Sequence, residues 1–266
     1  MKKSISMLSA VLMALWLSTT PGKCADIATN TASTGAFDYA QPALLTGTVY
    51  ETGSAHKKIL FKFQRSATRS GSTVRVERKF ILPDGSNAAT ENIVYEAGQM
   101  ISCEIKELQA SLWGNIQIQG DSKKPARQKI TINHGHDGDA KKAGTTEDMS
   151  RDVLIDDSIY PFIMAHWDEL MRGTSVKFQF VSLEWEKTFG FKFSKADESN
   201  RNGTPMVTIR MEPTNFLVAS FMDPLVFTVE KNAPHRVVEY LGRTTPRIKS
   251  GKSWKYLDAD TVFDWK

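Results

Sequence analysis

The sequence predicts a mainly β fold, a curled antiparallel sheet or β-barrel of about 10–12 strands with one amphipathic helix. Three observations predict it. Most of the chain alternates apolar and polar residues with a period of two, which is typical of strands with one face in water. Turn sequences rich in glycine, asparagine and aspartate separate these segments. A single segment in the middle has helical periodicity instead.

The first 24 residues have the composition of a secretory signal peptide. Met1-Lys2-Lys3 gives a basic start, and residues 5–17 form an apolar run that is too short to span a bilayer. A helix-breaking Pro21-Gly22 pair follows this run. We therefore expect an exported protein, located in the periplasm or outside the cell.

The cleavage position has two alternatives. A cut near Cys24 places small residues at the third-last and last positions of the signal, whereas a cut after Ala25 places Lys23 third from the end. Cys24 could instead be a lipoprotein cysteine, which would anchor the protein to a membrane. Lys23 argues against lipidation, because it stands where such a site takes a small residue.

Three of the lysines lie in this signal, so its removal lowers the formal net charge from +4 to +1. A near-neutral chain lacks the field with which nucleic-acid binders attract phosphate, and no zinc-finger spacing or RNA-recognition signature is present. We expect no nucleic-acid partner, and no transmembrane segment after the signal is removed.

Cys103 is the single cysteine left after processing at or beyond Cys24, so no internal disulfide can form. It shares strand parity with Ile101 and Ile105, and the polar residues between them point the other way, which predicts a thiol in the core. A buried neutral thiol is inert. The alternative, a catalytic cysteine, needs an electropositive, partly exposed setting with a base nearby.

Residues 25–42 are expected to form a flexible leader and residues 43–266 a single domain, since no linker divides them. Strands are expected over residues 59–64, 74–80, 116–118, 129–132, 176–180, 189–193, 207–211, 225–229 and 237–241. Strands joined by tight turns form antiparallel meanders, which close on themselves or stack as two sheets. Their interior positions are rich in Phe, Val and Ile, so a barrel would be filled with aromatic rings or would enclose an apolar lumen.

Residues 158–172 are expected to form the amphipathic helix, with apolar side chains at positions 159, 162, 163, 166/167 and 170 on one face. Asp157 or Ser158 can cap its start, Pro161 is tolerated in its first turn, and Gly173 suits a left-handed exit. Two roles stay open for it, a lid over one mouth of the lumen or a helix that only covers the core. Residues 214–224 are a second break, which periodicity does not assign to strand or helix.

The polar stretch from 121 to 148 is expected to be one short strand between solvated loops. His134 and His136 in it would project to the same side of an extended chain and could bind a transition metal together with a carboxylate. The segment resembles the opening of the metallo-β-lactamase ligand motif, but Gly138 and Asp139 stand where an aspartate and a following histidine are expected. Because a solvated hairpin tip explains the pair, we assign no metal, cofactor or catalytic residue.

Motifs of hydrolases and nucleotide-binding proteins are missing from the sequence, since it has no Gly-x-Ser-x-Gly elbow, His-Glu-x-x-His helix or phosphate-binding glycine loop. Helix capping and solvated helix faces explain the acidic pairs Asp156-Asp157 and Asp168-Glu169. Residues 235–256 gather basic and aromatic side chains beside a strand. They could hold an acidic sugar, a lipid phosphate or a peptide carboxylate, or form a strand pair whose cations meet nearby acids.

Three segments carry a resemblance to known proteins: Phe221–Glu230, the strand that ends in Tyr240-Leu241-Gly242-Arg243-Thr244, and the 157–173 helix with the strand over 176–180. They resemble an uncharacterised family of exported bacterial proteins of unknown function and, more distantly, periplasmic β-barrel domains of unknown function. The resemblance spans most of residues 43–266. It implies an envelope location and a barrel-like fold, and it carries no active residues to transfer.

Three classes of function stay open. The first, which we expect, is the non-catalytic binding or carriage of a lipid-like or other hydrophobic small molecule inside the curled sheet. The second is a cell-envelope enzyme or accessory subunit, metal-dependent through His134 and His136 or acting through scattered carboxylates. The third is a structural or interaction role in the envelope through sheet edges.

Overall fold

The computed structural model describes residues 38–120, 128–139, 144–149, 152–219 and 222–265. The expected signal peptide with Cys24, and most of the expected leader, lie outside these residues, as do residues 121–127 and 140–143 of the polar stretch. Within the described part of the chain, no helix combines the length and the apolar character needed to cross a membrane.

The described residues contain fifteen strands and three short α-helices. The strands are β1 (Leu44–Glu51), β2 (Ile59–Ser70), β3 (Thr73–Ile81), β4 (Asn87–Glu96), β5 (Gln99–Glu107), β6 (Leu112–Gln119), β7 (Lys129–His136), β8 (Thr145–Asp148), β9 (Val153–Leu154), β10 (Val176–Ser182), β11 (Lys187–Arg201), β12 (Thr204–Pro213), β13 (Leu225–Glu230), β14 (Val237–Ser250) and β15 (Ser253–Trp265). The helices are α1 (Ile159–Ala165), α2 (Trp167–Met171) and α3 (Phe216–Ala219).

All fifteen strands belong to one sheet, in the order β8-β7-β6-β5-β4-β3-β2-β1-β15-β14-β13-β12-β11-β10-β9. Two antiparallel meanders, β1–β8 and β10–β15, meet where β1 pairs with β15, and the short β9 adds a parallel pair at one end. The prediction of a mainly β protein built on a curled antiparallel sheet is confirmed. The backbone ladder is not closed, because β8 and β9 are its two ends.

The strand count exceeds the expected 10–12 because several strands lack a strong alternating pattern. The expected segments omit β1, β4 and β15, whose interior positions include small or polar residues such as Gly47, Ala89 and Thr261. The polar stretch likewise contains two strands, β7 and β8, where one was expected. Pairing with neighbours, rather than local hydrophobicity, therefore defines these strands.

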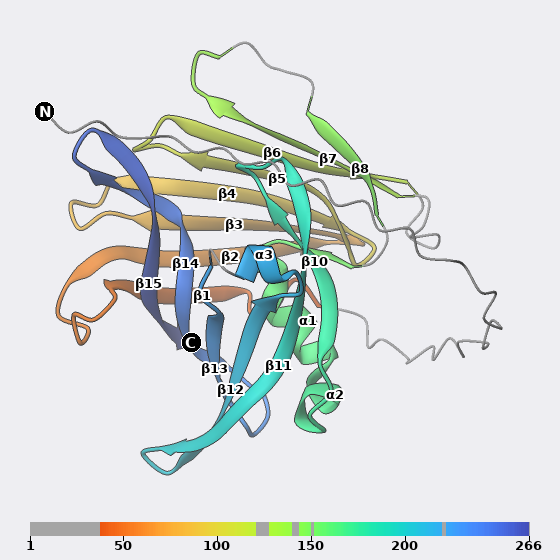
Figure 1. The fold of residues 1–266 in the computed structure, drawn as a ribbon, viewed down its shortest axis with the longest axis vertical. Coiled ribbons are helices and arrows are strands. Elements are labelled where there is room, and N and C mark those ends of the chain that lie inside the picture. The colour runs from red at the N-terminus through yellow and green to blue at the C-terminus, as the bar shows by residue number, and fades with distance from the viewer. Residues whose placement is uncertain (1–37, 121–127, 140–143, 150–151, 220–221, 266) are drawn as a thin grey trace, which may run out of the picture. The chain divides into compact units, whose positions relative to one another are not determined.

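The sheet curls so that its two halves face each other. In Figure 1, β3–β7 run across the view, whereas β11–β13 run down it. Interior side chains of the first half, among them Ile93 and Ile116, pack in one cluster with Val181 of β10. The concave faces of the two meanders therefore share one interior.

Two glutamates join the two ends of the curled sheet. Glu186, in the β10–β11 turn, accepts hydrogen bonds from the backbone N–H of His134 at 3.1 Å and from the Thr145 hydroxyl at 3.2 Å. Glu147 of β8 accepts from the backbone N–H of Thr188 at 3.0 Å and from its hydroxyl at 2.8 Å. We refer to this contact between β7–β8 and the β10–β11 hairpin as the seam. Hydrogen bonds to the two glutamate side chains connect the strands here, and no backbone ladder between described residues does.

The expected helix over 158–172 is present in two pieces. A 3₁₀ turn (Asp156–Ser158) leads into α1, and the chain departs from helical geometry at His166, with φ −108° and ψ 17°, before α2 begins. The predicted apolar face is confirmed, since Ile159, Phe162 and Leu170 are buried against the concave side of β10–β13. Gly173 ends the helical segment with φ +84°, as expected.

The start of the helix differs from the expected cap. The side chain of Ser158 makes no capping hydrogen bond to α1, and its hydroxyl exchanges hydrogen bonds with the backbone of Ile155 instead. Asp157 points into the protein interior, where it meets Arg65.

Candidate functional site

A cavity of about 710 Å³ lies between the two halves of the sheet. Strands β4–β7 contribute one wall, strands β10, β11 and β13–β15 contribute the other, and Val218 of α3 lies beside it. Its apolar lining consists of Cys103, Ile105, Leu112, Trp113, Ile116, Ile155, Phe180, Val181, Leu183, Trp185, Phe189, Phe191, Val218, Met222 and Leu225. A cavity of this size with this lining is typical of sites for small hydrophobic ligands.

A row of directly paired residues crosses the concave face from β2 to β7. Its members are Arg65, Arg78, Glu91, Ile105, Gly114 and His134. A Cβ at Gly114 would lie 2.6 Å from the Leu183 side chain, so the glycine gives the β10–β11 hairpin room to approach. This row supplies both the floor of the cavity and the charged side chains at one end of it.

The 3₁₀ turn before α1 inserts two carboxylates opposite the charged end of this row. The side chains of Asp157 and Arg65 are 1% and 5% exposed, with Nε to Oδ1 at 2.7 Å and Nη2 to Oδ2 at 3.2 Å. The Tyr95 hydroxyl donates to the same Oδ2 at 2.9 Å. The expectation that capping or solvation explains Asp157 is therefore wrong, because its carboxylate is buried and paired with an arginine.

Arg78, Glu91 and Asp156 continue this arrangement toward the cavity. Arg78 and Thr245 both donate to the Glu91 carboxylate, and Thr245 Oγ1 lies 3.3 Å from Asp156 Oδ2. We refer to Arg65, Arg78, Glu91, Asp156 and Asp157 as the charge layer. Glu91 and Asp156 line the cavity. A smaller cavity of about 100 Å³ lies against the same layer, beside α1.

Burial raises the pKa of two carboxyl groups in the charge layer. It raises the pKa of Glu91 above its ordinary value, although the neighbouring Arg78 opposes the change. Burial raises the pKa of Asp156 in the same direction, against the same arginine. The Asp156 side chain is 35% exposed and that of Glu91 only 2%, so Glu91 is the more firmly perturbed of the two.

A second polar group lines the cavity near the β14–β15 hairpin. Arg247 donates to the Tyr256 hydroxyl at 2.7 Å, lies 4.4 Å from the centre of its ring, and donates its backbone N–H to Glu107 at 3.0 Å. Burial, together with a hydrogen bond to Glu184, raises the pKa of Tyr256 to about 12. Burial also raises the pKa of Glu107, which the Arg247 charge opposes. These residues present both hydrogen-bond donors and acceptors at the cavity wall.

The basic and aromatic stretch at 235–256 contributes arginine and tyrosine side chains to the cavity wall. A β-bulge between Thr244 and Ile248 turns part of β14 toward the interior, and Arg247 is only 9% exposed there. Arg243 pairs with Asp258 at 3.3 Å and lies over the Tyr256 ring at 4.9 Å. The expected pairing of its cations with nearby acids is present at Arg243, and the expectation that the stretch holds an anionic ligand stays a prediction.

Trp185 marks an exposed edge of the cavity. It lies in the turn between β10 and β11 and is 67% exposed, although it also lines the cavity. Leu183 and Lys187 of the same turn region line the cavity as well. The α1–α2 segment, for which a role as a lid stayed open, contributes no residue to this lining, so the structure favours its core-covering role.

His134 and His136 lie on β7 rather than at a solvated hairpin tip. His134 is half-buried in the cavity wall, where burial and the nearby Arg247 lower its pKa. His136 is exposed, and its backbone N–H donates to Asp139 at 3.0 Å. Neither histidine belongs to a group of three ligating side chains among the described residues.

Cys103 lies in the core, as the sequence predicts. It is fully buried, and burial raises its pKa well above the ordinary value. Its neighbour in the predicted parity, Ile101, is 40% exposed, because a bulge pairs Val94 with Ser102 and Tyr95 with Met100. Ile101 is the extra residue of this bulge.

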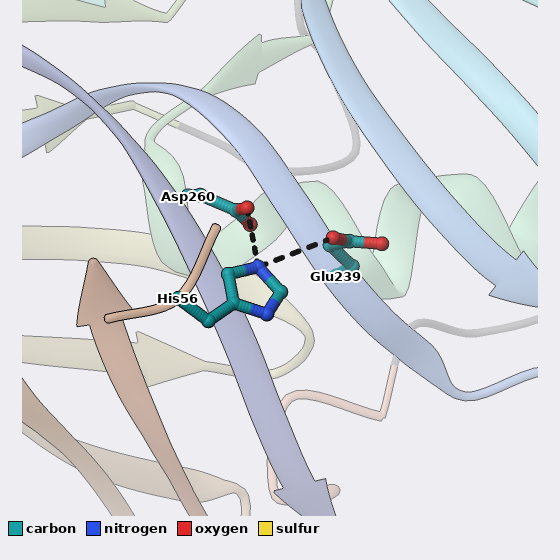
Figure 2. A group of neighbouring side chains, drawn as sticks. All are labelled: His56, Glu239 and Asp260. Carbon is teal, nitrogen blue, oxygen red and sulfur yellow. Dashed lines mark hydrogen bonds and ion pairs between the residues drawn. The ribbon is translucent and has the colours of Figure 1, made fainter. Parts of the chain in front are cut away.

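Among the described residues, one group of three side chains could hold a metal ion. His56 lies in the β1–β2 turn, Glu239 on β14 and Asp260 on β15, and their ligand atoms all lie within 4.8 Å of one another (Figure 2). None of the three lines the cavity.

The strand alternation itself could have revealed the charge layer. Arg65 has the parity of Phe61 and Phe63, Arg78 that of Val76 and Phe80, and Glu91 that of Ile93 and Tyr95. One charged residue at an interior position in each of three consecutive strands indicates a buried polar row. By contrast, no local pattern links this row to Asp156 and Asp157, which follow it by more than sixty residues.

Comparisons with protein-family models, with curated proteins and with solved structures found no match to this chain. The resemblance to exported bacterial proteins and to periplasmic β-barrel domains therefore stays a prediction. The geometry of the cavity and its lining is the basis for a functional assignment.

Proposed function

We propose that this protein binds and carries a lipid-like or other hydrophobic small molecule in the cavity between the two halves of its sheet, without transforming it chemically. The observation that supports this most is the cavity itself, about 710 Å³ in volume and lined mainly by aliphatic and aromatic side chains. Burial of an apolar ligand against such walls is favourable in proportion to the apolar area removed from water.

The polar groups of the lining suggest how the ligand is oriented. Arg247 and Tyr256 lie toward one part of the wall, and Glu91 with Thr245 lies toward another. A few polar groups in an otherwise apolar pocket are the usual means of fixing a head group. We therefore expect an amphipathic ligand, whose polar end contacts these groups and whose apolar part lies against Phe189 and Phe191.

The amino-terminal residues support a place for this activity in the cell envelope. The signal-like sequence over residues 1–24 predicts export, and an envelope protein meets lipids and other hydrophobic molecules that water does not dissolve. We accordingly propose a carrier or binding protein of the periplasm or the cell exterior.

A pair of matched substitutions tests this proposal. Ile105 of β5 lines the cavity, whereas Ile101 of the same strand is exposed on the bulge. Ile105→Trp fills part of the cavity and takes space that a ligand would occupy. It should therefore weaken the binding of a fluorescent fatty-acid analogue by about tenfold or more. Ile101→Trp makes the same change outside the cavity and should leave the affinity unaltered.

The native ligand is sought separately. Protein purified from its own envelope without detergent is extracted with organic solvent, and mass spectrometry should find one hydrophobic compound in stoichiometric amount. The proposal fails if the extract contains no such compound and if Ile105→Trp binds the analogue as well as Ile101→Trp and the wild type do.

A further inference from the structure

We propose that His56, Glu239 and Asp260 form a binding site for a divalent transition-metal ion. The site is separate from the cavity and does not depend on the ligand-carrier function. It joins the turn between β1 and β2 to the strands β14 and β15 (Figure 2).

The sheet register places the two carboxylates together. Leu241 of β14 pairs with Asp260 of β15, so Glu239, two residues earlier on β14, is a diagonal neighbour of Asp260 on the same face. Leu241 is 41% exposed, which identifies this as the solvent-facing side of the sheet. Two like charges at this spacing repel each other, and a cation between them would relieve the repulsion.

The β1–β2 turn holds the imidazole over these carboxylates. Ala55 and His56 have φ values of +50° and +60°, a left-handed conformation that is uncommon for non-glycine residues and often associated with functional sites. The His56 ring stacks on Tyr50 with centroids 4.7 Å apart, and Tyr50 pairs directly with Asp260. The strand pairing and the ring contact together fix the direction of the imidazole.

The ligand atoms face one another, and one of their contacts is shorter than in a metal-bound site. His56 Nε2 lies 2.5 Å from Asp260 Oδ2 and 3.8 Å from Glu239 Oε1. In tetrahedral zinc sites, bonds of about 2.0–2.2 Å place neighbouring ligand atoms about 3.3–3.5 Å apart. An ion therefore fits after the His56–Asp260 contact lengthens by roughly 1 Å.

A further observation concerns an Asp260 carboxylate oxygen that lacks a hydrogen-bond partner. Its second carboxylate oxygen, Oδ1, is buried and has no hydrogen-bond partner among the described residues. A buried carboxylate oxygen without a partner is unfavourable, and a bound cation would remove this cost. Bidentate coordination by Asp260 would satisfy both oxygens.

The charges and exposure of the group suit a divalent ion with a water ligand. Arg201 pairs with Glu239 through Oε2 and leaves Oε1 directed toward His56. The His56 side chain is 44% exposed, so solvent can reach a further coordination position. One imidazole nitrogen with carboxylate oxygens favours transition metals such as zinc over calcium or magnesium, which prefer oxygen ligands alone.

Zinc titration of the purified protein tests the site. The protein is prepared without a histidine tag, treated with chelator, and titrated with Zn²⁺ by calorimetry near neutral pH, where the expected result is one bound equivalent. His56→Gln should weaken this binding by about 100-fold or more, since it removes a ligand. His136→Gln, which removes an exposed histidine close to Asp139, is the matched control and should bind as the wild type does.

Two further variants keep the test independent of one substitution. Glu239→Gln and Asp260→Asn preserve side-chain size and should each weaken Zn²⁺ binding, while circular dichroism confirms that the sheet is intact. Ca²⁺ and Mg²⁺ should not compete. The proposal is overturned if the wild type binds no Zn²⁺ tighter than about 1 mM, or if His56→Gln binds as the wild type does.

Discussion

The buried pair Arg65–Asp157 offers the sharpest test of how this fold is held together. Asp157→Asn preserves the shape of the side chain but removes the charge that faces Arg65 at 2.7 Å. The guanidinium then keeps only the backbone oxygens of Tyr39 and Pro42, the amide oxygen of the substituted side chain and little water, since the Arg65 side chain is 5% exposed. We expect the protein to lose stability because a buried charge is left without its counter-charge.

The burial of both side chains indicates the size of this loss. Removing one partner of a buried ion pair typically costs about 3–5 kcal/mol, and asparagine retains one acceptor, so we expect about 3 kcal/mol. For a domain of this length each kcal/mol lowers the melting temperature by about 2–4 °C, which gives a decrease of about 6–12 °C. Urea unfolding gives the free energy, and differential scanning calorimetry gives the melting temperature.

An exposed pair and a double variant provide the controls. Arg243 and Asp258 also form an ion pair, but their side chains are 37% and 52% exposed, so Asp258→Asn should cost less than about 1 kcal/mol. Arg65→Met combined with Asp157→Asn should cost less than the sum of the two single changes, because the double variant leaves neither charge unpaired. If Asp157→Asn costs no more than Asp258→Asn, the assigned role of the buried pair is refuted.

Two further predictions concern the charge layer and the seam. Because burial raises the pKa of Glu91, its contribution to stability is largest below the ordinary carboxyl pKa and declines as the pH rises through the raised value. The melting temperature of the wild type relative to Glu91→Gln should therefore increase when the pH is lowered from about 7 to about 5. At the seam, Glu186→Gln weakens the hydrogen bonds from His134 and Thr145 and should accelerate amide hydrogen exchange in β7 and β8. Glu104→Gln, on the exposed side of β5, should not.

Each of these predictions has a contrary outcome. Parallel pH profiles for the wild type and Glu91→Gln would show that burial does not raise the pKa of Glu91. Unchanged exchange in β7 and β8 after Glu186→Gln would show that the curl of the sheet, rather than the glutamates, holds its two ends together.

The charge layer and the cavity are connected through the 3₁₀ turn that carries Asp156 and Asp157. The 3₁₀ turn before α1 carries Asp157 to Arg65 and Asp156 to the cavity wall beside Glu91. The same short segment therefore connects the helix to the sheet through Asp157 and contributes Asp156 to the polar part of the cavity lining. A change in the charge layer should alter both the stability of the protein and its affinity for the proposed ligand.

Much of the architecture follows from local patterns in the chain. Alternation over segments such as 59–64, 74–80 and 207–211 predicts strands, because a sheet with one covered face requires every second side chain to be apolar. Turn residues between them predict antiparallel neighbours, and the apolar stripe of 158–172 predicts the helix, which forms as α1 and α2. The burial of Cys103 follows from the same parity.

Only the tertiary structure decides how these elements combine into a site. The pairing of β1 with β15, the seam at Glu147 and Glu186, and the meeting of Arg65 with Asp157 all join residues far apart in the chain. Periodicity reports which side of a strand is buried but not which distant side chain shares the interior. The cavity, the charge layer and the group at His56 are therefore properties of the curled sheet, whereas strand and helix character is already present in the order of the residues.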